Sequence, residues 1–143
     1  MASRLFSRRR DGRVEVRLSA DGRAFVGATA REVVAAERDA GHAWGAGLHA
    51  PIDPASDTDD PLAILSRQRD LASNAELVLA TLEEAALTDA EAWAWFCTLQ
   101  VALRSIAVAN GLLDDDAWDA QSGPLVEHVH TIQALLFELA RVL

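Results

Sequence analysis

Apolar residues in the second half of the chain recur at alternating steps of three and four positions, a spacing that places them on one face of an α-helix. One such stripe follows the helix-starting pair Asp60-Pro61 and predicts a helix over about 61–86. The segment that starts at Thr88 has the spacing of a capping box, and it predicts a helix over 89–110. A last helix begins at Pro124 and keeps a seven-residue apolar pattern to the end of the chain.

The first 40 residues follow a different pattern. Short apolar stretches near 4–8 and 13–18 flank Asp11-Gly12, a turn sequence that favours a β-hairpin. Because an isolated hairpin is marginally stable, we expect it to lie against a helix or to pair with another chain's edge. A helix is predicted over 20–39, and Ala24-Phe25-Val26 is the alternative place for a third strand.

Two segments lack these periodicities. Residues 40–60 are rich in glycine, proline and aspartate and predict a loop, and the acidic segment 113–123 could contain a short turn of helix. The 143 residues, half of them apolar, are enough for one packed domain. The predicted fold is therefore mainly α, an antiparallel bundle of three long helices and one shorter helix with a small N-terminal hairpin. Its predicted parts are the hairpin (1–19), a helix (20–39), the loop (40–60) and the bundle (61–143).

The predicted 89–110 helix is apolar on two sides. Trp93 and Trp95 point about 200° apart on a helical wheel, so they cannot share one face. Only Glu91, Thr98 and Ser105 form a narrow polar line. A helix that is apolar nearly all round is buried on both sides, either within one chain or against a second copy. We expect a homodimer whose interface contains the second face, made of Trp93, Cys97, Val101 and Val108.

The sequence contains no recognisable catalytic pattern. It has no glycine-rich phosphate loop, nucleophile elbow or pair of catalytic carboxylates, so we expect neither an enzyme nor a cofactor. The pair Glu127 and His130 occurs once, which indicates a solvated helix face rather than a metal site. Cys97 is the only cysteine and is expected to be a small buried hydrophobe. With no membrane-length apolar run and no signal peptide, the chain is expected in the cytoplasm and away from membranes.

The charges are unevenly distributed. The first 40 residues hold nine of the 13 arginines against six acidic residues, whereas the remainder holds four arginines against 16 acidic residues. A body this acidic repels nucleic acid. The basic concentration around the hairpin turn is a candidate contact for an anionic partner, or a charged edge that prevents aggregation. Its residues are Arg8, Arg9, Arg10 and Arg13.

A set of apolar and acidic positions spans nearly the whole chain in a recognisable order: Phe6-x-Arg8, Val14 to Leu18, Asp60-Pro61, Ala75-x-x-Val78-Leu79-Ala80-x-Leu82, Leu87-x-x-x-Glu91-Ala92-Trp93, Leu99, Leu103 and Leu136-x-x-x-Ala140-x-x-Leu143. In these positions the chain resembles an uncharacterised actinobacterial family, domain of unknown function twenty-seventeen. The resemblance implies a small helical protein, often encoded beside the Clp protease adaptor S, and some members are labelled regulators. It implies no active site, and the loop 40–60 departs from the usual pattern.

Apolar helix faces without converging polar groups are typical of a protein that acts by binding other proteins. We therefore expect a non-enzymatic regulatory or adaptor protein. The alternative is a transcription regulator that contacts DNA or the transcription machinery through its arginine-rich hairpin. An enzyme would require a deep pocket with perturbed acids or histidines.

Overall fold

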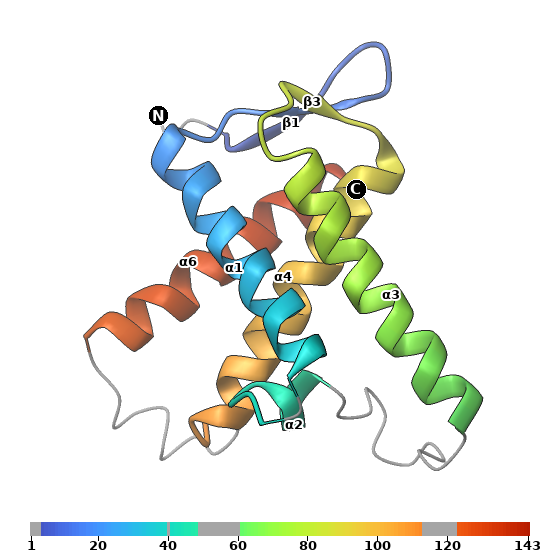
Figure 1. The fold of residues 1–143 in the computed structure, drawn as a ribbon. Helices are drawn as coiled ribbons and strands as arrows, with labels where there is room; N and C mark the ends of the chain where they lie inside the picture. The colour runs from blue at the N-terminus through green and yellow to red at the C-terminus, as the bar shows by residue number, and fades with distance from the viewer. Residues whose placement is uncertain (1–3, 40, 49–60, 113–122) are drawn as a thin grey trace.

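The computed structural model describes residues 4–39, 41–48, 61–112 and 123–143. Within these residues four long helices form an antiparallel bundle, with α3 running opposite to α1 and α4 and with α6 crossing obliquely (Figure 1). The predicted mainly α fold with an N-terminal hairpin is confirmed, and the first long helix is as long as the last. The long helices are α1 (Ala20–Arg38), α3 (Pro61–Ala80), α4 (Asp89–Ala109) and α6 (Pro124–Val142).

The central helix of the bundle is α4, which contacts all three other long helices. It begins with the predicted capping box, because Glu91 N donates to Thr88 Oγ1 at 3.2 Å and Thr88 N donates to Glu91 Oε1 at 2.9 Å. It ends before Asn110, and Gly111 follows with a φ of +66°, a left-handed conformation that favours glycine. The sequence prediction of this helix is correct to within one residue.

The predicted hairpin is present as β1 (Phe6–Arg8) and β2 (Val14–Val16), which pair antiparallel. A third strand, β3 (Ala86–Leu87), pairs with the other side of β2. The alternative third strand at residues 24–26 is wrong, because those residues lie inside α1. The sheet therefore joins the start of the chain to the connection between α3 and α4.

Helix α3 ends at Ala80, six residues before its predicted end, although its apolar stripe continues. The backbone carbonyl groups that come after Ala80 accept hydrogen bonds from distant parts of the chain. The guanidinium of Arg23 donates to the carbonyl oxygens of Leu82 at 2.6 Å and Glu84 at 3.0 Å, and Val16 N donates to the oxygen of Ala85 at 2.9 Å. These tertiary hydrogen bonds replace those that a longer helix would have formed.

The hydrophobic core is densest where the sheet covers the end of the bundle. Phe6 of β1 meets the ring of Trp95 edge to face, with 6.3 Å between ring centroids, and both side chains are fully buried. Trp95 Nε1 donates a hydrogen bond of 2.9 Å to Thr81 Oγ1. The buried indole therefore satisfies its polar atom while it fills the centre of the core.

The predicted loop 40–60 is not entirely irregular, because it contains the four-residue helix α2 (Gly45–Leu48). Gly47 lets α2 approach α4 closely: a Cβ atom at this position would lie 2.6 Å from the Cα of Ser105 and 3.1 Å from the Cβ of Val108. The remainder of that loop, residue 40 and residues 49–60, lies outside the described residues, as do residues 113–122.

Candidate functional site

The two tryptophans at the start of α4 lie in opposite environments, as their spacing predicts. Trp95 is fully buried, whereas 51% of the surface of Trp93 is exposed. The ring of Trp93 meets that of Phe96 edge to face at 5.6 Å between centroids, and Phe96 is half-buried. An aromatic pair thus stands at the surface of a helix whose opposite side forms the core.

The other residues of the predicted interface are less exposed than Trp93. Cys97 and Val101 are half-buried, and Val101 packs against the core. Val108 is also half-buried and lies beside Gly47 of α2. Because α2 approaches the carboxyl end of this face, the exposed part of the predicted interface is concentrated around Trp93.

Two of the three residues in the polar line on α4 are buried. Thr98 is 2% exposed and Ser105 is fully buried, so neither faces solvent. Ser105 Oγ donates to the carbonyl oxygen of Val101 at 2.8 Å, which satisfies the hydroxyl within the helix. Thr98 Oγ1 is buried without a hydrogen-bond partner among the described residues. Their small size allows neighbouring elements to pack closely against α4.

Cys97 is the free thiol of the chain. Burial raises the pKa of this thiol, so it stays protonated at neutral pH. A protonated thiol is a poor nucleophile. The sequence predicts Cys97 to be a small buried hydrophobe, and the structure shows it half-buried.

Two of the four arginines in the candidate anionic-partner site hold the hairpin in place. The guanidinium of Arg8 donates to the carbonyl oxygens of Gly12 and Val142 and to Asp89 Oδ1, each at 2.6 Å. Arg13 Nη2 donates to the carbonyl oxygen of Ala86 at 3.0 Å. These two side chains therefore connect the sheet to α4 and to the end of α6.

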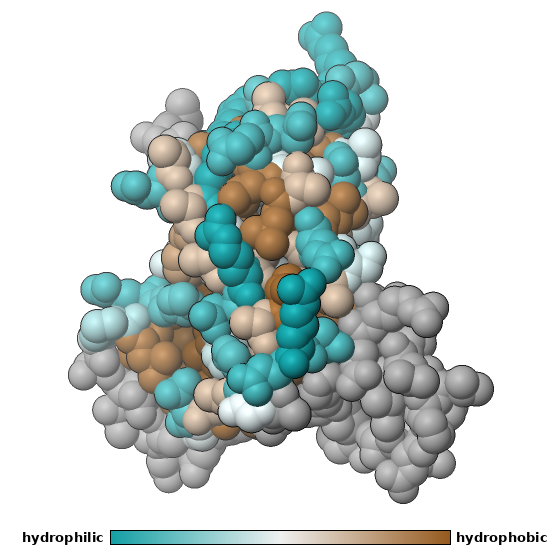
Figure 2. Space-filling view, viewed as in Figure 1, coloured by the Kyte–Doolittle hydropathy of each residue, from teal (hydrophilic) through white to brown (hydrophobic). Residues whose placement is uncertain are grey.

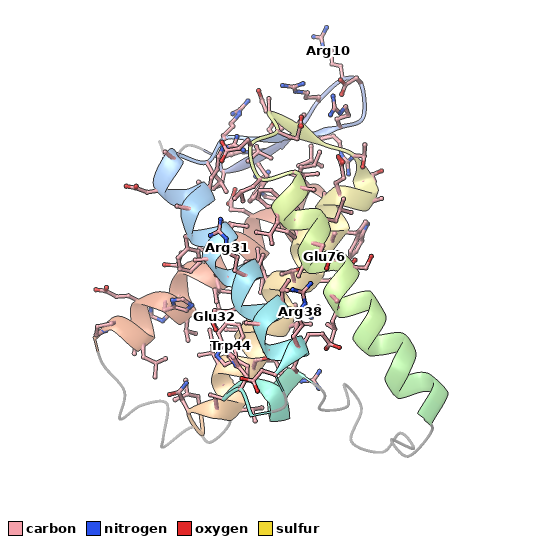
Figure 3. The ribbon with its side chains drawn as sticks, in the orientation of Figure 1. Arg10, Arg31, Glu32, Arg38, Trp44 and Glu76 are labelled. Carbon is pink, nitrogen blue, oxygen red and sulfur yellow. The ribbon has the colours of Figure 1, made fainter. Side chains whose placement is uncertain are left out.

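The other two arginines are more available. Arg9 lies 3.7 Å from Glu15 Oε1 in a half-buried ion pair. Arg10 projects from the tip of the hairpin, away from the rest of the molecule (Figure 3), and it forms no ion pair within the described part of the chain. The predicted basic cluster thus offers one side chain that is clearly directed at solvent.

The outer edge of the hairpin is blocked by α6. Arg141 Nη2 donates to the carbonyl oxygen of Phe6 at 3.0 Å, and the backbone N–H of Leu5 donates to Glu138 Oε2 at 3.3 Å. Of the two arrangements that the sequence left open for the hairpin, the structure shows packing against helices. Backbone groups that would otherwise attract another strand are already used.

A cavity of about 330 Å³ lies at the opposite end of α4 from the sheet. Its walls come from the residue before α2, from the carboxyl end of α4 and from the first turns of α6. Figure 2 shows hydrophobic surface near the amino-terminal part of α6, at the lower left. The lining residues are Trp44, Ile106, Asn110, Pro124, Leu125 and His128. Sequence reasoning missed this site, because these residues come from three separate segments without a common motif.

The described residues contain no group of three metal-ligating side chains that could share a metal ion. One described helix, α4, is long and apolar enough to cross a membrane, but it is the core helix of the bundle. The structure is therefore compatible with a soluble protein.

Searches against protein-family profiles, curated proteins and solved structures give no significant match for this chain. The family resemblance noted in the sequence stays a prediction.

Proposed function

We propose that this chain is a non-enzymatic regulatory or adaptor protein of the cytoplasm, which forms a homodimer and acts through protein–protein contacts. The observation that carries the proposal is Trp93, a half-exposed indole paired with Phe96 on the outer side of the central helix. Exposed aromatic groups are enriched at protein interfaces, where their burial supplies much of the binding free energy.

A two-fold axis beside Trp93 would bring the same helix of two copies together. Cys97 lies about one helical turn further along α4, on the same side, so it would be near the contact. Phe137 of α6, 71% exposed, is the other large hydrophobic residue that stands out from the described surface. The surface formed by Trp93 and Phe96 would be available for exchange between the second copy and a different partner.

Light scattering on a sizing column tests this proposal. The native chain should elute with twice the mass of the 15.4 kDa monomer at micromolar concentration, and Trp93→Glu should elute as a monomer. Ala28→Glu is the matched control, because it adds the same charge at an exposed position of α1. A native monomer would contradict the homodimer, and a dimer that survives Trp93→Glu would move the interface elsewhere.

The alternative, contact with nucleic acid through the hairpin, has less support. Arg8 and Arg13 already bind backbone carbonyls within the chain, which leaves Arg9 and Arg10 for an external anion. Binding to duplex DNA should weaken steeply with salt if these residues contact phosphates. A slope of log affinity against log salt near zero would exclude the alternative.

A further inference from the structure

The cavity at the α2 end of α4 is an open hollow at the surface, lined by two aromatic rings and a few polar groups. Its volume of about 330 Å³ lies at the lower end of the range for small-molecule pockets. Its apolar walls are supplied by Ile106, Pro124 and Leu125. Among its described lining residues none carries a carboxylate or guanidinium group, so these walls favour an uncharged occupant.

Two aromatic side chains of this cavity pack against neighbouring rings, and the ring of Trp44 meets that of His42 edge to face at 5.9 Å between centroids. The backbone N–H of Trp44 donates to His42 Nδ1 at 3.0 Å, and His42 Nε2 lies 2.8 Å from Glu32 Oε2. Because Nδ1 accepts, the ring proton is on Nε2 and is donated to the carboxylate. Figure 3 shows Glu32 and Trp44 close together at the carboxyl end of α1. The other ring, His128, packs against Phe25 at 4.9 Å between centroids.

The polar atoms of the cavity are not used elsewhere in the described part of the chain. The indole N–H of Trp44 and both ring nitrogens of His128 form no hydrogen bond with a described residue. Asn110 uses its amide nitrogen to donate to the carbonyl oxygen of Ile106 at 2.9 Å, which leaves its side-chain oxygen as an acceptor. Apolar walls with a few free donors and acceptors are characteristic of pockets that orient a ligand.

We propose that this cavity binds an uncharged aromatic group with a polar edge, which lies against the rings of Trp44 and His128 and forms a hydrogen bond with Asn110 or His128. Two sources share this chemistry. The group can belong to a free small molecule or to an aromatic side chain of a partner protein. The inference is independent of the homodimer, because none of the cavity residues belongs to the Trp93 surface.

The test is a titration of the full chain with indole, followed through the indole N–H signals of its four tryptophans by NMR. A ring of this size should bind with a dissociation constant of about 1 mM, which follows from the free energy that small ligands gain per atom. The Trp44 signal should shift and saturate, while that of buried Trp95 stays constant. No shift at Trp44 up to about 10 mM indole would overturn the proposal.

Two further probes define the ligand class. Cyclohexanol has a similar size but no aromatic face, so it should bind at least about threefold more weakly than indole. Equal binding of the two would overturn the assignment of an aromatic ligand. N-acetyltryptophanamide presents the indole as a protein would: saturable binding at Trp44 favours a partner side chain as the source, and binding of indole alone favours a free small molecule.

Variants connect the binding to this cavity. Leu125→Trp should fill it and weaken indole binding at least about tenfold, whereas Ala134→Trp introduces the same side chain at a separate cavity beside α1 and should leave binding unchanged. If Leu125→Trp does not fold, His128→Ala provides the test. It removes one of the two aromatic rings that line the cavity and should also weaken indole binding. Unchanged binding in a folded variant of either cavity residue would overturn the proposal.

Discussion

The two ends of α4 are packed in different ways. At the sheet end, one large side chain, Trp95, fills the core, and its polar atom is hydrogen-bonded to Thr81. At the α2 end, packing depends on the small residues Gly47 and Ser105, and a cavity remains between α2, α4 and α6. Around Trp95 the core is filled and the indole N–H is hydrogen-bonded, whereas the cavity at the α2 end has polar atoms without a partner among the described residues.

This difference indicates which end of the molecule contributes to stability and which end is available for binding. Arginine side chains at the sheet end donate to backbone carbonyls and connect elements that are distant in sequence, so they contribute mainly to stability. The polar side chains that line the cavity at the α2 end form no hydrogen bond to a distant element among the described residues. Changes at the sheet end should therefore alter stability first, and changes at the α2 end should alter binding first.

The largest effect is expected for Trp95→Ala, which should destabilise the protein by about 3–5 kcal/mol because it opens a cavity in the core. It also leaves the hydroxyl of Thr81 without its donor. Urea denaturation measures the change, with Trp93→Ala as control at about 1 kcal/mol or less, since that indole is half exposed. Equal losses in the two variants would break the distinction between the closed core and the surface.

A smaller effect is expected for Arg23→Ala. This side chain donates to carbonyl oxygens at the end of α3 and to the oxygen of Val16, and hydrogen bonds from a charged group contribute about 1.5–3 kcal/mol. Arg31→Ala, in the same helix, is the matched control: Arg31 is exposed and forms no ion pair within the described residues, so its loss should stay within about 0.5 kcal/mol. Denaturation of both variants under one set of conditions checks the difference.

Two buried threonines sharpen the comparison further. Thr81→Val leaves the indole N–H of Trp95 without an acceptor and should cost about 1–3 kcal/mol. Thr98→Val replaces a buried hydroxyl that has no partner among the described residues, so it should be neutral or stabilising. Thermal unfolding at one pH compares them. A destabilised Thr98→Val would show that its hydroxyl has a partner after all.

The smallest effects are expected from changes in pH. Stability should fall in a different pH range for each end of the molecule. Burial lowers the pKa of His128, so the folded state binds fewer protons than the unfolded state and stability falls as the pH drops below about 6.5. At the sheet end, the hydrogen bond from Arg141 lowers the pKa of Glu138; its stabilising contribution is present above about pH 4.3 and is lost as the pH falls further.

Urea midpoints measured from neutral to acid pH test both windows. His128→Gln should remove the loss near pH 6, and Glu138→Gln should reduce only the loss below about pH 4.3. If either variant changes the other window, the two ends do not titrate independently.

The positions of the long helices follow closely from local signals. The capping box at Thr88 and the proline at position 124 mark helix starts that the structure shows at the same residues. The turn at Gly12, with a φ of +87°, likewise agrees with the predicted hairpin. These signals act over a few residues, so the amino-acid order alone is enough to predict them.

The candidate sites were less predictable. Helical geometry predicted that Trp93 and Trp95 face different sides, because they are two residues apart. That Trp93 is half exposed in the single chain came only from the structure. The burial of Thr98 and Ser105 did not follow, since it depends on which elements pack against that side of α4. The cavity beside Trp44 is formed only when three separate segments meet.

By itself, the sequence determined the type, order and starts of the main elements, because periodicity, caps and turn residues act locally. The tertiary structure alone decided where α3 stops, because Arg23 and β2 take the hydrogen bonds that would have extended it. It also decided which arginines are structural and which polar groups stay free. Those outcomes depend on distances between residues far apart in the chain, which no local pattern encodes.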